Sequence, residues 1–307
     1  MKRSKILFVS NKTLNRNGVP RIEASYYNFY VAMAELGYTM EFYDTVNPVE
    51  PDFDKVVERF KPTLVFSILT GNQQVTPHEP IKSIKNLTRS GMVKTFNWFC
   101  DDTWRYETFS KPVCRMFSHC STPEPHMVAR YYEDGYENIH LGNWHVNESV
   151  ISLGANNQFD VGFVGGFNNQ RVSGLKALQQ SGVNIGNIQG ATHEDMLLLY
   201  CNSKIGVNFS VNENDPTKQT QMKLRMFEVP ACRALLITQE HKGLEQFFVP
   251  GKEIETFSTE AEMQDKVRFY LKNDAARRTI AEAGWQRFMK EHTSRNRLAN
   301  LLDVLGA

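Results

Sequence analysis

The sequence has no apolar run that approaches the roughly 18 to 20 residues needed to cross a membrane as a helix. It also lacks a strong excess of charge of either sign, since 35 Lys and Arg face 34 Asp and Glu and leave a net charge of +1. Broad nucleic-acid binders usually carry a basic excess, so that class is not favoured, although a local basic patch is compatible with the balanced total.

Cysteine is scarce and unpatterned. The five residues are odd in number and lack C-x-x-C spacing, which argues against both a disulfide framework and a zinc site. We interpret them as reduced and mostly buried, hence a cytoplasmic protein. The N-terminal residues 1–10 begin with basic side chains like a signal peptide, but their apolar part is too short and predicts a first strand instead.

At 307 residues the chain fits two domains of about 150 residues each. Short apolar runs alternate with helical segments, a pattern typical of parallel sheets wound with helices. In the first half, strands are expected at residues 6–9, 39–43, 62–68, 93–96 and 139–141. In the second half they are expected from residue 159 and at 183–188, 205–209, 234–238 and 254–257.

The polar loop 11–20 follows the first expected strand and precedes an expected helix at about 21–36. Ligands of open α/β sheets bind at the carboxyl ends of the strands. Asn17, Gly18 and Arg21 are therefore candidates for contact with a sugar or an acceptor. An ordinary solvent loop is the alternative interpretation.

A second polar stretch, residues 97–105, follows the fourth expected strand. It places Asp101 and Asp102 between Trp98 and Trp104. An indole offers an apolar face to a pyranose ring, and a carboxylate accepts from hydroxyls or takes a proton as a base. The alternative is that one aspartate caps the following helix. Adjacent carboxylates lack the D-x-D spacing that holds a divalent ion on a diphosphate, so no metal is predicted.

The second half opens with a strand that runs into Gly165 and Gly166, followed by Arg171. Glycines let the backbone approach a phosphate, and an arginine adds charge. The G-x-G-x-x-G fingerprint of dinucleotide-binding domains is absent. Later, Ser210 and Asn212 begin a polar loop after the strand expected at 205–209.

The most informative stretch is 221–238, where Lys223, Arg225 and Glu228 occupy a short amphipathic helix before an apolar strand. Two cations beside a helix N-terminus suit a diphosphate, and a nearby carboxylate suits ribose hydroxyls. The alternative is a surface helix with an ordinary mix of charges.

Arg225, the run 227–232 (FEVPAC) and the run 235–238 (LLIT) resemble the donor-site segment of CgeB-like (spore maturation) glycosyltransferases, which are relatives of the group 1 families. The likeness continues through 250–255, 280–284 and 291–293. It implies an α/β chain with the GT-B fold, in which two Rossmann-like doubly wound domains face each other. The implied domains are 1–153 on the acceptor side, 154–288 for the nucleotide sugar, and 289–307 as a helix returning to the first domain.

The resemblance implies transfer of a sugar from a nucleotide-diphosphate sugar, with a UDP-sugar expected as co-substrate, to a hydroxyl acceptor. It implies a metal-independent reaction that retains the anomeric configuration. Glu228 is expected to hold ribose, while Arg171, Lys223 and Arg225 neutralise the diphosphate. Thr220 stands where group 1 enzymes often carry a first glutamate, so Ser210 or Asn212 is expected to contact the sugar instead.

The acceptor stays open between a glycan, a protein, a small molecule and a hydroxylated base in phage DNA. For DNA, the cations Lys82, Lys85, Arg89 and Lys94 predict a basic patch, with a solvated helix face as the alternative. Two other classes also fit: a non-catalytic nucleotide- or sugar-binding module, and a nucleotide-dependent epimerase of the same fold.

Overall fold

The computed structural model describes residues 4–16, 19–152, 158–165, 172–211 and 218–307. The chain divides into two compact units. Unit 1 comprises Met1–Asn143 and Ser294–Ala307, and unit 2 comprises Trp144–Thr293. The terminal helix α12 (Ser294–Val304) therefore belongs to unit 1. In the part of the chain that the structure describes, no helix is long and apolar enough to cross a membrane.

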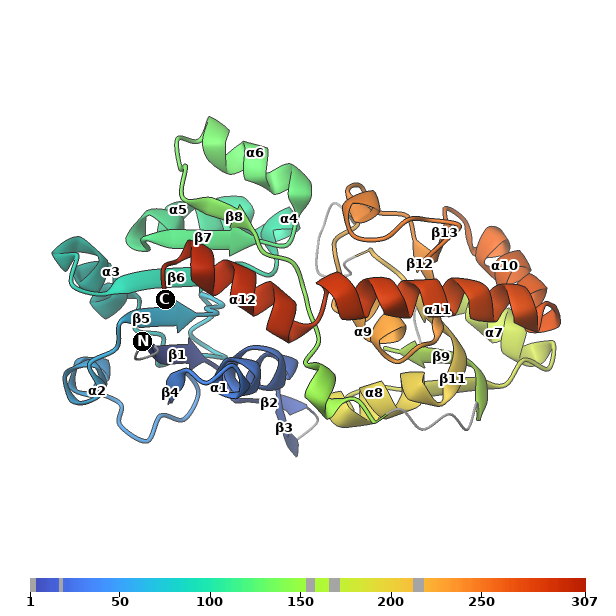
Figure 1. The fold of residues 1–307 in the computed structure, drawn as a ribbon, viewed down its shortest axis with the longest axis horizontal. Helices are drawn as coiled ribbons and strands as arrows, with labels where there is room; N and C mark the ends of the chain where they lie inside the picture. Colours follow the sequence, from blue (N-terminus) through green and yellow to red (C-terminus); the bar gives the residue numbers. More distant parts are fainter. Residues whose placement is uncertain (1–3, 17–18, 153–157, 166–171, 212–217) are drawn as a thin grey trace. The chain divides into compact units, whose positions relative to one another are not determined.

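Unit 1 contains a six-stranded parallel sheet with the order β4-β1-β5-β6-β7-β8 (Figure 1). The strands are β1 (Lys5–Ser10), β4 (Thr39–Asp44), β5 (Leu64–Ser67), β6 (Lys94–Trp98), β7 (His119–Thr122) and β8 (Ile139–Leu141). In this sheet β1 lies between β4, which follows it along the chain, and β5, which follows β4. Loops after β1 and β5 therefore diverge at this point, which is where doubly wound sheets bind ligands.

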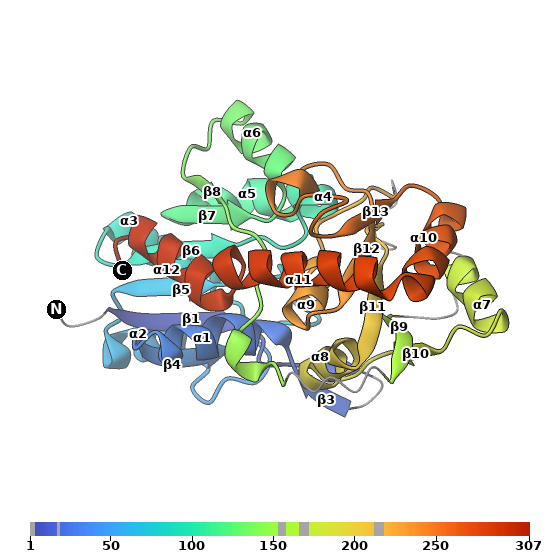
Figure 2. The ribbon, with the colours of Figure 1, turned by 45° about the vertical axis from the view of Figure 1, so that its right-hand side comes forward.

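Apolar side chains on both faces of this sheet explain its burial. One face packs against α2 (Phe53–Phe60), α3 (Ile81–Ser90) and α6 (Pro125–Glu133). Phe8, Phe66 and Phe96 form an aromatic row along the sheet, with Phe29 from η1 (Tyr26–Val31) packed on it. Helix α12 contacts η1 and α1 (Ala32–Glu35), and both views of the ribbon show it beside this sheet (Figures 1 and 2). Lys94 Nζ donates to the Leu305 carbonyl at 2.6 Å and ties the chain end to β6.

The loop expected at 11–20 is instead an antiparallel hairpin. Strand β2 (Thr13–Arg16) pairs with β3 (Val19–Ile22), so that Leu14 lies opposite Arg21. Arg21 therefore belongs to a strand, and the expected helix start at Arg21 is wrong. The polar composition hid this hairpin. Pro20 is tolerated because β3 is an edge strand that pairs with β2 alone among the described residues.

Unit 2 contains a five-stranded parallel sheet with the order β10-β9-β11-β12-β13. The strands are β9 (Phe159–Val164), β10 (Ile185–Ile188), β11 (Ser203–Asn208), β12 (Leu235–Gln239) and β13 (Glu255–Phe257). One core packs around α8 (His193–Cys201) and α9 (Arg225–Ala231), and a second around α7 (Ser173–Gln180) and α10 (Glu260–Lys272). Helix α11 (Asp274–Glu291) contacts α9 and β12.

Gly284 lets α11 approach the preceding chain closely. A Cβ at this position would lie 2.3 Å from the backbone oxygen of Glu253. Alanine normally favours a helix over glycine by about 1 kcal/mol. Here we expect Gly284→Ala to lower the free energy of unfolding by about 1–3 kcal/mol, because the backbone must move.

Urea unfolding measures this effect, with Gln286→Ala on an exposed position of α11 as the control. The control is expected to change stability by less than about 0.5 kcal/mol. Equal or greater stability of Gly284→Ala would show that the close approach is not a constraint.

Candidate functional site

The carboxyl edge of the unit 2 sheet brings together segments that are far apart in the sequence. From β9 the chain continues to β10 on one side, whereas β11 lies on the other side of β9. The loops after β9 and β11 therefore separate at this edge, which creates the crevice typical of ligand sites in such sheets. Gly165 follows β9, and Ser210 lies just beyond β11.

Helix α9 is mostly buried and carries Arg225 and Glu228. Together with Lys223 just before the helix, these residues are called the Arg225 cluster. Met226, Phe227 and Val229 are fully buried and fix the helix against the sheet. The residues before it are also anchored, since Trp144 Nε1 donates to the Met222 carbonyl at 3.1 Å. The helix is thus not the surface helix that the mixed charges allowed as an alternative.

Glu228 lies in this buried environment with 2% of its side chain exposed. Its Oε1 lies 3.2 Å from Nδ1 of His193, which is fully buried. His193 is the first residue of α8, and a capping box between Thr192 and Asp195 fixes that helical turn. His193 was not among the predicted site residues. The capping signature of Thr192 and Asp195 marks it as the start of a helix, but not as a neighbour of Glu228.

Arg225 lies one helical turn before Glu228 and is half-buried. Among the described residues, none forms a hydrogen bond or ion pair with its guanidinium. Its charge nevertheless acts on the buried phenol of Tyr200. Burial raises the pKa of the Tyr200 phenol, while Arg225 lowers it and Glu228 raises it further. Arg225, Tyr200 and Glu228 therefore share one electrostatic environment.

Gly165 and Ser210 are both engaged with neighbouring backbone. Gly165 has a φ of +147° and accepts a hydrogen bond from Asn187 Nδ2 at 3.1 Å. Ser210 Oγ donates to the Gln239 carbonyl at 2.9 Å, which ties the end of β11 to β12. Lys223 is half-buried beside α9. The other predicted residues of this half, Gly166, Arg171 and Asn212, lie outside the described residues, as do Asn17 and Gly18 of the first half.

In unit 1, the structure separates the two predicted tryptophans. Trp98 has 2% exposure, and its Nε1 donates to the Gly142 carbonyl at 2.6 Å. Its ring packs against Phe29. It is therefore a core residue and offers no face to a sugar. Trp104 is half-buried, with the Arg105 guanidinium 5.5 Å from its ring centre.

The two predicted aspartates also have different environments. Asp102 is completely buried, accepts from Tyr131 Oη at 2.9 Å and also accepts from Ser110 Oγ. A base that faces an acceptor must reach solvent, so the prediction of Asp102 as that base is wrong. Asp101 precedes α4 (Asp102–Arg105), is half-buried and makes no side-chain capping bond. It remains a candidate for contact with an acceptor.

Burial raises the pKa of Asp102 to about 7, against smaller opposing effects of hydrogen bonds from Ser110, Thr122 and Tyr131. The folded state therefore binds a proton that the unfolded state has lost above about pH 4. Stability contributed by this group falls as the pH rises from about 4 to about 7 and stays low above that. We expect the wild type to lose roughly 2 kcal/mol more than Asp102→Asn between pH 5 and pH 8.

Urea unfolding at the two pH values measures this difference. The neighbouring substitution Asp101→Asn is the matched control, and it should leave the pH dependence as in the wild type. An unchanged pH dependence in Asp102→Asn would contradict the assignment of the buried proton to Asp102.

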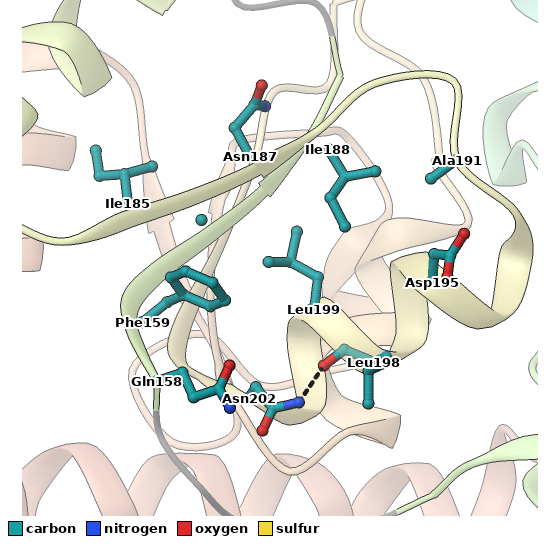
Figure 3. Close-up of a pocket in the computed structure, with 11 residues that line it drawn as sticks. Gln158, Phe159, Ile185, Asn187, Ile188, Ala191, Asp195, Leu198, Leu199 and Asn202 are labelled. Carbon is teal, nitrogen blue, oxygen red and sulfur yellow. Dashed lines mark hydrogen bonds between the residues drawn. The ribbon is translucent and has the colours of Figure 1, made fainter.

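A pocket of about 650 Å³ opens in unit 2 beside the edge strand β10 (Figure 3). Phe159, Ile188 and Leu199 supply apolar surface, and Asn202 Nδ2 at one end donates to the Leu198 carbonyl at 2.9 Å. The described lining residues include none of the predicted site residues and no Lys or Arg. These described residues offer no cation to a diphosphate, and they share no residue with the Arg225 cluster.

Comparison with known proteins finds one family match, in the second half of the chain. Residues 153–303 match the family described as "Glycosyl transferase-like". No curated protein matches the chain.

Several solved structures share the fold over nearly their whole length. Sucrose-phosphate synthase from Thermosynechococcus elongatus has 12% identity and a TM-score of 0.67, with 99% of both chains covered. Anabaena HepE, solved in complex with UDP and glucose, has 10% identity and a TM-score of 0.67, with 99% of this chain and 100% of that chain covered. T4 phage BGT, solved in complex with its UDP-glucose substrate, has 13% identity and a TM-score of 0.59, with 98% of both covered. The predicted GT-B fold with two parallel-sheet α/β domains is confirmed.

Proposed function

We propose that this protein, which has the GT-B fold of glycosyltransferases, moves a sugar from a nucleotide-diphosphate sugar to a hydroxyl acceptor. The match of residues 153–303 to the glycosyl transferase-like family supports this proposal. The donor is expected to be a UDP-sugar, as in the complexes of Anabaena HepE and T4 phage BGT. The motif around Arg225 and Glu228 further supports membership of the CgeB-like proteins. All five cysteines are free, and four are buried, which supports a reducing, cytoplasmic setting.

The observation that carries this proposal is the placement of Arg225 and Glu228. They are three residues apart on α9 and so lie on the same side of the helix. They stand at the carboxyl edge of the unit 2 sheet, where doubly wound folds bind nucleotides. An arginine that pairs with no carboxylate in the described part of the chain suits a phosphate, and a carboxylate suits ribose hydroxyls.

We assign charge neutralisation to Arg225, with Lys223 and Arg171 as additional cations. When the glycosidic bond breaks, negative charge grows on the departing diphosphate. Cations already fixed at that position lower the barrier without reorganising. On this account the diphosphate needs no metal ion. Retention of anomeric configuration is proposed on the resemblance to group 1 enzymes.

The acceptor is proposed to contact unit 1. Asp101 is the remaining carboxylate of the predicted pair that is not fully buried, and it lies just after β6. Trp104 and Arg21 are the described candidates for contact with the acceptor or the sugar. A hydroxyl acceptor needs a group that takes its proton, and Asp101 is proposed for that role.

A hydroxylated base in DNA is a second candidate acceptor. Lys82, Lys85 and Arg89 follow the spacing of one face of α3, with Lys82 and Arg89 exposed and Lys85 half-buried. Lys94 does not belong to this row, because it lies on β6 and donates to the Leu305 carbonyl. Binding to duplex DNA that weakens steeply with salt would support this acceptor. Absence of salt-dependent binding would remove it.

Turnover of a donor panel tests the proposal. The protein is incubated with UDP-, GDP-, ADP- and dTDP-sugars, and mass spectrometry follows free sugar and nucleotide diphosphate. We expect slow hydrolysis of one donor, which is lost in Arg225→Ala. Binding without any release, even with glycan acceptors added, would favour a non-catalytic binding module. Conversion of the donor sugar to an isomer without release would favour an epimerase.

A further inference from the structure

His193 and Glu228 lie close together inside the candidate site. Both side chains are almost fully removed from solvent, and 3.2 Å separates Nδ1 of His193 from Oε1 of Glu228. The two residues come from α8 and α9, which pack against each other. A buried carboxylate is costly unless a polar or charged group faces it. Nδ1 of His193 lies within reach of Oε1, and a proton held between these two atoms would offset part of that cost.

The position of His193 is itself fixed. The Thr192 side chain accepts from the Asp195 backbone at 3.1 Å, and Asp195 accepts from the Thr192 backbone at 3.3 Å. These two bonds define the first turn of α8. The imidazole is therefore held on a rigid element, which is what a residue that orients a partner requires.

We propose that His193 is a positioning residue for Glu228, and this rests on the proposed function. In the proposed arrangement Nδ1–H of His193 bonds to Oε1, and the other carboxylate oxygen is left to accept from the ribose hydroxyls of the donor nucleotide. His193 touches no substrate in this arrangement. It holds the buried Glu228 carboxylate in one orientation for binding ribose. Hydrogen-bond partners of metal-binding side chains orient those ligands in the same way.

This arrangement makes a specific demand on the nucleotide. A site built to bond a hydroxyl rejects an analogue that lacks it, because the polar group in the site is then left without its partner. UDP should therefore bind more tightly than 2′-deoxy-UDP or 3′-deoxy-UDP. The discrimination should depend on His193 as well as on Glu228.

Calorimetric titration with UDP and the two deoxy analogues tests this with the full-length protein. The wild type is expected to prefer UDP over at least one analogue by about tenfold or more. His193→Leu removes the donor at similar volume and should abolish the preference, as should Glu228→Gln. His193→Asn retains an N–H near the place of Nδ1 and should restore most of it. Glu194→Gln, exposed on the next residue, is the matched control and should bind like the wild type.

Kinetics adds a readout that a purely structural role would not move. Lost ribose binding should raise the donor KM about tenfold in His193→Leu while kcat changes less than threefold, since ribose contacts are made in ground state and transition state alike. His193→Gln, which moves the N–H away from the Nδ1 place, should behave like His193→Leu and keeps the test valid if the leucine variant fails to fold.

The outcomes distinguish a failure of the His193 proposal from a failure of the proposed donor site. If Glu228→Gln abolishes the preference while His193→Leu or His193→Gln keeps it, His193 is not a positioning residue and only this inference fails. If Glu228→Gln keeps the preference, Glu228 does not read ribose, and the proposed donor site itself is wrong.

Discussion

Arg225→Ala should lower kcat for sugar transfer by about 10²- to 10³-fold, the loss typical of removing one preorganised group that stabilises transition-state charge. Arg225 is the cation of α9, it forms no ion pair with any residue that the structure describes, and it lies one turn before Glu228. Its charge is therefore available to the departing diphosphate. Donor affinity should fall less than kcat, because the negative charge on the leaving group increases as the bond breaks.

Steady-state kinetics with the donor found in the panel measures this. Arg225→Lys should recover part of the rate, since it keeps the charge but loses the planar fork. Arg233→Ala is the matched control, because Arg233 lies just past the other end of α9 and pairs with Glu282 at 2.6 Å in an exposed position. If turnover and donor affinity both survive Arg225→Ala, the site assignment is wrong.

Glu228→Ala should have the second largest effect, because it combines loss of donor binding with loss of stability. The substitution leaves His193 buried without its 3.2 Å partner and opens space beside it. Removing one member of a buried polar pair costs about 1–3 kcal/mol, so the free energy of unfolding should fall by about 2 kcal/mol. Stabilisation by UDP in a thermal melt should disappear.

Glu282→Ala provides the comparison for Glu228→Ala. Its carboxylate also pairs with a basic side chain, but that pair is solvent-exposed and should contribute less than about 1 kcal/mol. Glu228→Gln separates the two effects, since it keeps the volume and removes the charge. Equal stability losses in Glu228→Ala and Glu282→Ala would contradict the buried-pair account.

The sequence predicted the sheets well, because continuous apolar runs such as Ile6 to Val9 have few alternatives to a strand buried on both faces. It failed at the hairpin β2–β3, where polar residues and Pro20 hid the pairing. Two strands of four residues that bury little apolar surface leave no periodic signal. Their pairing is decided by backbone bonds that the pattern of side chains does not reveal.

The candidate site was predictable only where residues lie close in the sequence. Arg225 and Glu228 belong to one motif, so helical spacing was enough to put them together. Trp98 and Asp102 were misjudged because a position at or just after the end of a strand does not say which way its side chain turns. Both turn into the core, where Gly142, Ser110 and Tyr131 provide hydrogen-bond partners.

His193 was missed for a related reason. It belongs to a different helix from Glu228, and only the packing of α8 against α9 brings the two side chains together. A single histidine at the start of a helix gives no signal in the sequence that separates a carboxylate partner from an ordinary buried side chain. Contacts of this kind become visible only in the folded chain.

A crystal structure of the protein soaked with UDP tests the central claim most directly. The account predicts that the nucleotide lies at the carboxyl edge of the unit 2 sheet, with phosphate oxygens at Arg225 and ribose hydroxyls at Glu228. UDP bound instead in the pocket lined by Phe159, Ile188 and Leu199, with the Arg225 cluster unchanged, would contradict it.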